Sequence, residues 1–420
     1  MPWPPPLSAY DQTVPHPSGR PELAERFAEL RAARTELGRS VDPRDVRQVA
    51  VVCSSSRGGS THLEALLREV PGVLTLPGEI NPLVVVAQLG ELPHRGAVLA
   101  EELGLQIGRP ARDVRGQDDQ RLLALDIAWR LLAQQPDRAL PAARVEQAVR
   151  DALAGTSLDA AGLTRAVLDR LDVPLAGYDV PDAAPPPLPP SDALVEMTPF
   201  VPLRPWRAPT GAELRDGTLL LATPRLVYRL DWLRAVFPTA RLRLVHLVRN
   251  PAAAVNGLVD GWQHPGFATV AMPHPLTIPG YSDRVPGGER WWKFDVPPSW
   301  GSLVDRPLRR VCAAQWCDAH ERVLAETRGE EVLRIRHEDL AADDGRSREP
   351  AEQLAEFLGL DRDAVVQAVC AGAPPVVATA PPRPARWRRR ADELADVLAD
   401  PGVLDLAERL GVGTDPDRWE

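Results

Sequence analysis

The chain has 420 residues, of which 44% are hydrophobic, and its formal net charge is -9 at pH 7. This length can bury a large core in one big domain or two smaller ones. The negative charge excludes a global attraction to nucleic acid or to anionic membranes, so any anion site must be local. No apolar run is long enough to cross a bilayer, and the proline-rich N-terminus lacks a signal-peptide pattern, so we expect a cytoplasmic protein.

The four cysteines (Cys53, Cys312, Cys317 and Cys370) lack the spacing of a metal site. We interpret them as small buried hydrophobes in a reducing cytosol, and we expect no bound metal. Ala, Arg and Pro are frequent, whereas Lys293 is the only lysine. This codon-driven bias indicates a GC-rich bacterial genome.

In chain order, residues 1–44 are predicted to form a proline-rich arm and a flanking helix over 21–37. One main domain is expected over 45–420. Between about 96 and 190 the pattern is helical and poor in strands, and it ends in a proline-rich connector. This stretch predicts a helical insertion, which either lines the substrate or only packs against the domain.

A predicted anion site follows the first strand of the domain. The apolar run 49–53 ends abruptly in hydroxyls, one arginine and two glycines, and a helical pattern begins at once with Leu63 at its first apolar position. The first N–H groups of a helix lack partners inside the helix, and its dipole favours negative charge there. Glycines let the backbone approach a ligand, and an arginine presents a fork of donors to phosphate or sulfate. The residues concerned are Arg57, Gly58, Gly59, Ser60 and Thr61.

The second half of the chain alternates strands and helices. Strands are expected over 218–222, 241–248 and 331–336, with helices between them, which predicts an α/β fold with a central parallel β-sheet flanked by helices. The strand over 241–248 runs straight into Arg249, which places this arginine at the carboxyl rim, where open α/β sheets bind ligands. An arginine at this position suits a second phosphate that is held without a metal.

The run Ser56-Arg57-Gly58-Gly59-Ser60-Thr61 is not a Walker A motif. It resembles the 5′-phosphosulfate loop of the sulfotransferases that use 3′-phosphoadenosine 5′-phosphosulfate (PAPS), in particular the bacterial and Golgi-type members. Ser56 stands where proline is usual, and Gly58 stands where serine is usual. The strand that ends at Arg249 resembles the 3′-phosphate motif of this family. The serine of that motif is replaced by Gly257, with Asn256 beside it as a candidate replacement.

Three further segments resemble the family in the same order. Residues 383–390 resemble the late basic-aromatic segment that closes over the donor nucleotide, with Arg386 and Arg388 as candidate phosphate partners. A solvated charge run is the alternative interpretation. A turn at 223–225 resembles a Lys-x-Pro turn without its lysine, which leaves Arg225 as a candidate substitute. Residues 336–340 resemble a segment that we interpret as structural.

The resemblance implies a P-loop-like sulfotransferase fold with PAPS as co-substrate, 3′,5′-adenosine bisphosphate as product and no metal. The acceptor is expected to be a hydroxyl of a small molecule, such as a secondary metabolite. Glu79, which follows a short predicted strand over 72–76, is the first candidate for the general base, because several relatives carry Gly-Glu at this distance. His62 is the second candidate. His246 lies within a strand and is interpreted as a core histidine.

Two questions stay open at this stage. The aromatic stretch 291–295, together with Trp262 and Trp300, either forms the wall of an acceptor pocket or packs a long loop onto the core. The function has two alternatives to a sulfotransferase. One is a P-loop kinase or nucleotidase that uses ATP and Mg²⁺, against which the missing Walker lysine and aspartate argue. The other is a non-catalytic scaffold that keeps the sulfotransferase fold.

Overall fold

The structure is a computed structural model. It describes residues 20–419 apart from eleven stretches: 79, 90–94, 111–115, 135, 137–139, 156–159, 174–205, 265, 268, 342–344 and 374–377. The predicted arm at 1–18, the candidate base Glu79 and the proline-rich connector therefore lie outside the described residues. Among the described helices, none combines the length and the hydropathy that crossing a membrane requires.

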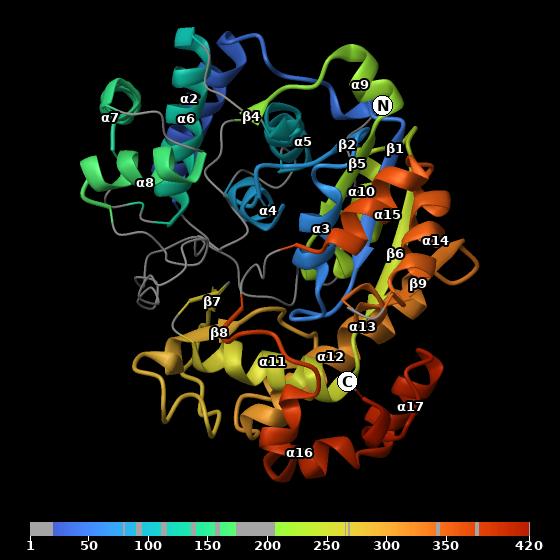
Figure 1. Cartoon of the computed structure of the whole chain (residues 1–420). Coiled ribbons are helices and arrows are strands. Elements are labelled where there is room, and N and C mark those ends of the chain that lie inside the picture. Colours follow the sequence, from blue (N-terminus) through green and yellow to red (C-terminus); the bar gives the residue numbers. More distant parts are fainter. Residues whose placement is uncertain are drawn as a thin grey trace.

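A five-stranded parallel sheet occupies the centre of the protein, in the order β2-β5-β1-β6-β9 (Figure 1). Its strands are β1 (Gln48–Cys53), β2 (Val73–Leu74), β5 (Thr218–Ala222), β6 (Arg241–Val248) and β9 (Val332–Arg336). The α/β fold class predicted from the sequence is thus confirmed. Because all five strands are parallel, their carboxyl ends meet at one edge, and the loops that follow them share that edge.

Helices cover both faces of the sheet, and the alternation of side chains along β1 decides which residue serves which face. Val49 and Val51 join one core with helices on the first face, while Ala50 and Val52 join another core on the second face. The first face is covered by α2 (Pro21–Glu36), α4 (Asn81–Ala87), α5 (Arg95–Gln106), α10 (Leu230–Val236) and part of α12 (Leu308–Glu326). The second is covered by α3 (Ser60–Leu67), α13 (His337–Leu340), α14 (Arg348–Leu358) and α15 (Arg362–Ala371).

Three helices within the predicted insertion build a small core of their own, beside α2 (Figure 1). They are α6 (Gly116–Gln134), α7 (Ala142–Gly155) and α8 (Ala160–Arg170). Trp129 of α6 packs edge-on against Phe27 of α2, with ring centroids 5.5 Å apart, and so ties this core to the main one. Two very short strands, β3 (Arg109–Pro110) and β4 (Trp206–Arg207), pair antiparallel. Two residues are too few for a periodic pattern, so the sequence did not predict them.

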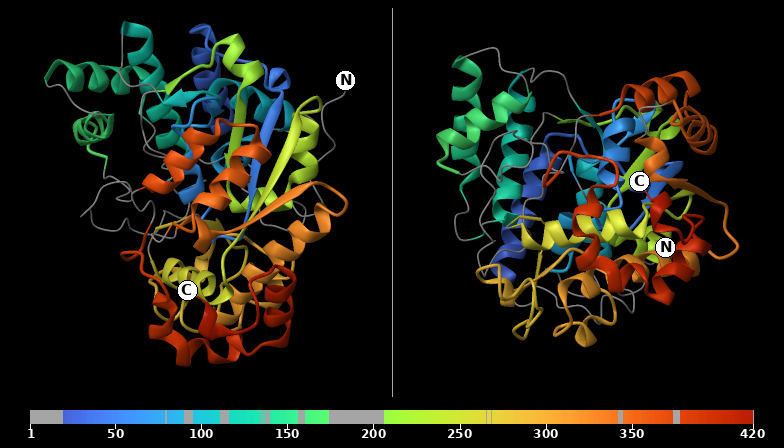
Figure 2. Two further views of the ribbon diagram at one scale, coloured as in Figure 1. Left: turned by 45° about the vertical axis from the view of Figure 1, so that its right-hand side comes forward. Right: turned by 60° about the horizontal axis from the view of Figure 1, so that its bottom comes forward.

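A third lobe lies below the carboxyl edge of the sheet (Figures 1 and 2). It contains α11 (Pro251–Gln263), most of α12, α16 (Ala391–Leu398) and α17 (Pro401–Arg409), which share one core. Within this lobe, β7 (Thr269–Ala271) and β8 (Trp291–Lys293) form a short antiparallel hairpin that includes part of the aromatic stretch 291–295. Trp292 of β8 and Trp262 are fully buried and touch edge-to-face at 5.1 Å. Both indoles therefore serve packing of this lobe.

The remaining helix, α9 (Gly211–Asp216), precedes β5 and begins with a capping box between Thr210 and Glu213. The cysteines follow the expectation only in part. All four are free, and Cys53 and Cys312 are buried, but Cys370 is exposed near the end of α15, so the expectation of burial is wrong for that thiol.

A buried histidine pair lies where β6 packs against α12. His246 Nε2 and His320 Nδ1 are 2.9 Å apart, so one ring donates a hydrogen bond to the other. Burial lowers the pKa of His320 to about 3. Burial, and then the neighbouring His320, lowers the pKa of His246 well below its ordinary value. This confirms His246 as a hydrogen-bonded core residue, and both rings are neutral at pH 7.

This pair predicts a loss of stability in mild acid. The unfolded chain takes up protons on both histidines below about pH 6.5, while the folded protein does not, so the free energy of unfolding falls as the pH drops from about 6.5 toward 3. Each histidine contributes up to about 1.4 kcal/mol per pH unit. Urea unfolding at pH 7, 6 and 5 should show a shallower decline for His320→Gln than for the wild type. Parallel profiles would contradict this account.

Candidate functional site

The loop between β1 and α3 has a backbone that requires glycine. Gly59 is the residue before α3 and has a φ of 99°, and no side chain caps the N-terminus of that helix. A Cβ at position 58 would lie 2.7 Å from the carbonyl oxygen of Ser55, so only glycine fits there. A Cβ at position 59 would overlap the ring of His337, the residue that follows β9. The backbone conformation of the loop is therefore restricted by its own turn and by His337 just after β9.

Arg57 is the basic side chain of this loop, and its own φ of 62° is left-handed. Its guanidinium lies 5.0 Å from the centre of the Phe267 ring, within cation–π range. Burial, and then the charge of Arg249, lowers the pKa of Arg57 to about 10, while the charge of Asp260 opposes this shift. Arg57 therefore stays charged at pH 7, and its buried positive charge favours binding of an anion.

Arg249 reaches the same loop from the end of β6, as the sequence predicted for the carboxyl rim. Its Nη1 donates a hydrogen bond to the backbone oxygen of Arg57 at 3.1 Å. Its Nε is buried and has no hydrogen-bond partner among the described residues. Burial lowers the pKa of Arg249, and the carboxylate of Glu338 opposes that shift. The two predicted arginines thus meet at one place on the sheet edge.

Glu338 fixes the start of the helix that follows Arg249. One of its carboxylate oxygens accepts hydrogen bonds from the backbone N–H of Asn250 at 2.9 Å and from the Asn250 side-chain amide at 2.7 Å. The Asn250 side chain in turn accepts from Ala253 N and caps α11. The segment 336–340, interpreted from the sequence as structural, therefore contacts the loop after β1 through His337 and the start of α11 through Glu338.

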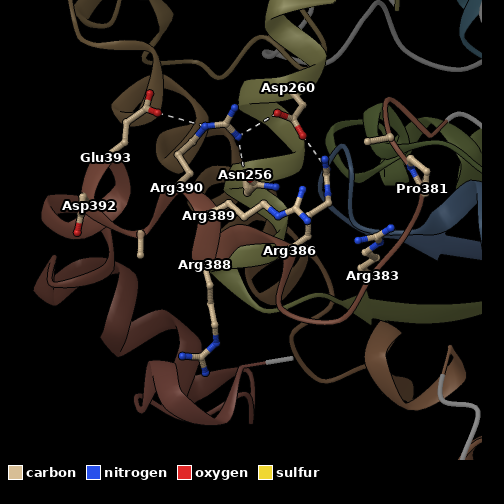
Figure 3. Close-up of a pocket in the computed structure, with 12 residues that line it drawn as sticks. Asn256, Asp260, Pro381, Arg383, Arg386, Arg388, Arg389, Arg390, Asp392 and Glu393 are labelled. Carbon is tan, nitrogen blue, oxygen red and sulfur yellow. Dashed lines mark hydrogen bonds and ion pairs between the residues drawn. The ribbon is translucent and has the colours of Figure 1, made fainter.

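A basic cavity of about 530 Å³ opens between α11 and the C-terminal segment (Figure 3). Asp260 of α11 holds two arginines there, Arg386 at 2.6 Å and Arg390 at 2.9 Å. Asn256 accepts a further hydrogen bond from Arg390 through Oδ1. Because an arginine can only donate, this bond fixes the orientation of the Asn256 amide. The lining includes Arg383, Arg386, Arg388, Arg389 and Arg390.

Arg386 and Arg388, which the sequence grouped together, differ in their surroundings. Arg386 faces Asp260, and its charge lowers the pKa of both Arg57 and Arg249, which places it near the two sheet-edge arginines. Arg388 points away from Asp260 in Figure 3 and donates to the backbone oxygen of Asp417 at 3.0 Å. Trp387 lies between these two arginines in the sequence, and its buried side chain anchors the segment in the core of the third lobe. The structure brings Arg386 to the site more closely than Arg388.

Gly257 lies directly against the anion loop. A Cβ at this position would be 3.3 Å from the Arg57 Cβ and 3.7 Å from its Nε. The first distance is tighter than ordinary van der Waals contact, so a side chain here would require Arg57 to shift by a few tenths of an ångström. The neighbouring Asn256 presents its amide to Arg390.

Of the two candidate proton acceptors, His62 lies on the α3 side of the loop. His62, in the first turn of α3, is half-buried, and its ring centroid is 5.5 Å from that of His337. Burial, followed by the charge of Arg249, lowers the pKa of His62, so it is neutral at pH 7. Glu79 lies outside the described residues. Arg130, which belongs to α6 of the insertion, donates a hydrogen bond to the backbone oxygen of Pro77 at 3.3 Å. The insertion therefore contacts the turn just before Glu79.

The chain was compared with protein-family models and with curated protein sequences, and neither gives a match. Two solved structures are similar to it. One is the sulfotransferase domain from the curacin biosynthetic pathway, with 14% identity, coverage of 87% of this chain and 98% of that chain, and a TM-score of 0.37. The other is the sulfotransferase domain from the Synechococcus PCC 7002 olefin synthase, with 17% identity, coverage of 87% and 95%, and a TM-score of 0.36. Both are sulfotransferase domains, the family that the sequence motifs resemble.

The close contact of Gly59 with His337 yields a stability prediction. Gly59→Ala must accommodate both a left-handed backbone and the overlap with the ring, whereas Gly72→Ala, at a φ of 82° with open space around it, meets the backbone cost alone. We expect a loss of about 1 kcal/mol for Gly72→Ala and at least about 2 kcal/mol for Gly59→Ala in urea unfolding. Equal losses would mean that the His337 ring does not restrict the loop.

Proposed function

We propose that this protein is a sulfotransferase that uses PAPS and forms a sulfate ester on a hydroxyl of a small molecule. One observation carries the proposal. Arg57 and Arg249, which follow the adjacent strands β1 and β6, are joined by a hydrogen bond, and the charge of Arg386, which lines a basic cavity, acts on both of them. A nucleotide with phosphates at both its 5′ and 3′ ends needs two anion sites, and two basic side chains at one sheet edge can supply them.

The residues present fit the two ends of this donor. We assign the 5′ end to Arg57 and to the uncapped N–H groups of α3, with Ser60 and Thr61 as hydroxyl donors. We assign the 3′-phosphate to Arg249, whose buried Nε lacks a partner among the described residues, together with Arg386. Asn256 is assigned to the same end, as the replacement for a serine at Gly257.

The proposed reaction requires the protein to position the donor and the acceptor and to stabilise the charge on the leaving group. PAPS supplies the sulfuryl group and leaves as 3′,5′-adenosine bisphosphate. By analogy with phosphoryl transfer, the transition state is loose and negative charge gathers on the departing phosphate. A guanidinium and preorganised N–H groups at that place would stabilise this charge. Arg57 therefore has the leading catalytic role in this proposal.

The acceptor hydroxyl must also lose a proton. Glu79 is proposed as the general base because it follows β2 in the sequence, as several sulfotransferases carry Gly-Glu at this distance after the anion loop. His62 is the second proposal, since a neutral imidazole can accept a proton at pH 7. The helical insertion reaches this region through Arg130, which supports a role for α6 in bordering the acceptor.

A kinase or nucleotidase would use a lysine in the anion loop, and Lys293 cannot serve. It is fully buried, and its ammonium donates to the backbone oxygens of His264 and Gly266.

If the protein binds the product of PAPS, saturating 3′,5′-adenosine bisphosphate should raise the melting temperature, with about 2.7 kcal/mol of stabilisation at a hundredfold excess over Kd. Mg-ATP should not. Stabilisation by Mg-ATP alone would reject the sulfotransferase proposal.

The two arginines of the C-terminal segment provide a matched comparison. Because Arg386 faces Asp260 and the sheet edge, Arg386→Ala should weaken binding of 3′,5′-adenosine bisphosphate by about tenfold or more. Arg388→Ala, which removes a side chain that lies on Asp417, should stay within about twofold of the wild type. Calorimetric titration measures both. A larger effect for Arg388→Ala would place the nucleotide elsewhere on this segment.

Catalysis separates an enzyme from a scaffold with the same fold. Incubation with labelled PAPS and a panel of small hydroxyl compounds should transfer label with the wild type, and Glu79→Gln should lose most of that activity while it still binds the bisphosphate. His62→Asn, made in parallel, tests the second base. A wild type that binds the bisphosphate yet neither transfers label nor hydrolyses PAPS would favour a non-catalytic scaffold.

A further inference from the structure

A carboxylate from the third lobe reaches the entrance of the anion loop. Asp295 is 1% exposed, and its Oδ2 accepts a hydrogen bond from the backbone N–H of Ser56 at 3.2 Å. The two residues are 239 positions apart in the chain. The other carboxylate oxygen, Oδ1, is buried without a hydrogen-bond partner among the described residues. A buried carboxylate is costly, so its presence here calls for a role beyond packing.

The backbone around Asp295 is held firmly. Gln315 of α12 donates from its side-chain amide to the carbonyl oxygens of Lys293 and Asp295, at 2.9 and 2.6 Å. The indole N–H of Trp292 donates to the Asp295 carbonyl oxygen at 2.9 Å. The Gln315 amide is itself oriented by Trp262, whose indole N–H donates to its Oε1. The position of the Asp295 carboxylate is therefore set by the buried core of the third lobe.

Arg225 provides the nearby positive charge. Its Nη2 donates to the carbonyl oxygen of Phe294 at 3.1 Å. Burial raises the pKa of Asp295, while the hydrogen bond from Ser56 and the charge of Arg225 both lower it. Arg225, which the sequence offered as a substitute for a lysine on the donor, thus acts beside Asp295. It stabilises the ionised carboxylate under the loop.

The hydrogen bond also depends on the residue at position 56. A proline there would have no N–H to donate, whereas serine, like any other residue, supplies one. Position 56 comes directly before Arg57, whose left-handed φ of 62° helps to set the direction in which its side chain leaves the backbone. The chain thus combines a non-proline residue at 56 with a buried acceptor for its N–H, immediately before the arginine of the site.

We propose that Asp295 is a positioning residue for the anion loop: by holding the Ser56 N–H it fixes the backbone that leads into Arg57. This inference rests on the proposed function for its effect on the nucleotide. The contact itself belongs to the ligand-free protein. Without Asp295, the loop would sample other backbone conformations, and the donor would bind less tightly because part of its binding free energy would be used to order the loop.

The test compares four variants with the wild type: Asp295→Asn, Ser56→Pro, the double variant, and Ser56→Ala as a control that keeps the N–H. Amide hydrogen exchange of the peptide covering residues 54–59 is measured without nucleotide, and binding of 3′,5′-adenosine bisphosphate is measured by calorimetry. Asp295→Asn keeps an acceptor oxygen for the Ser56 N–H but removes its charge. We therefore expect this variant to weaken that hydrogen bond, to speed exchange in this peptide but not in β6, and to weaken binding by about tenfold. Ser56→Ala should match the wild type.

The double variant decides whether the two residues act together. We expect it to bind no more weakly than Ser56→Pro alone, because the same hydrogen bond has already been lost. Additive losses, or unchanged exchange in Asp295→Asn, would overturn the proposal. If Asp295→Asn fails to fold, Ser56→Pro decides on the same readouts, since it leaves Asp295 in place. A wild type that does not bind the bisphosphate would instead overturn the proposed function, while the exchange comparison still decides the role of Asp295.

Discussion

Two like charges held close together are the constraint on which the site depends. The register of the sheet pairs Cys53, the last residue of β1, with His246 of β6, so the loops after these strands start from the same edge. Arg57 and Arg249 meet there although the charge of Arg249 lowers the pKa of Arg57. The carboxylates of Asp260 and Glu338 offset part of this repulsion. Under the proposed function, an anion bound between the arginines would offset the rest.

The third lobe contributes further residues to the site at the carboxyl edge of the sheet. Its core buries Trp387 and Trp292, and these two anchors hold the segments that carry Arg386 and Asp295. Arg386 approaches the sheet-edge arginines from one side, and Asp295 supports the anion loop from another. The site is therefore assembled from four regions of sequence, and its geometry depends on packing between the lobe and the sheet.

Local patterns were enough to predict the sheet, the anion loop and Arg249, because each depends on apolar periodicity next to a glycine or an arginine. Partners distant in sequence were not predictable in the same way. Glu338 contacts Asn250 across 88 positions, and Asp295 contacts Ser56 across 239, and nothing in the local sequence marks either carboxylate as a partner. Gly257 illustrates the same limit, because only the structure shows that a Cβ at this position would lie against the Arg57 Cβ.

The central claim is that Arg57 and Arg249 hold opposite ends of one nucleotide. Calorimetric titration with adenosine 5′-monophosphate and adenosine 3′-monophosphate tests it most directly, in the wild type and in Arg57→Ala and Arg249→Ala. The account predicts that Arg57→Ala weakens only the 5′-monophosphate and Arg249→Ala only the 3′-monophosphate, each by about tenfold or more. Equal losses for both ligands in both variants, or none, would contradict it.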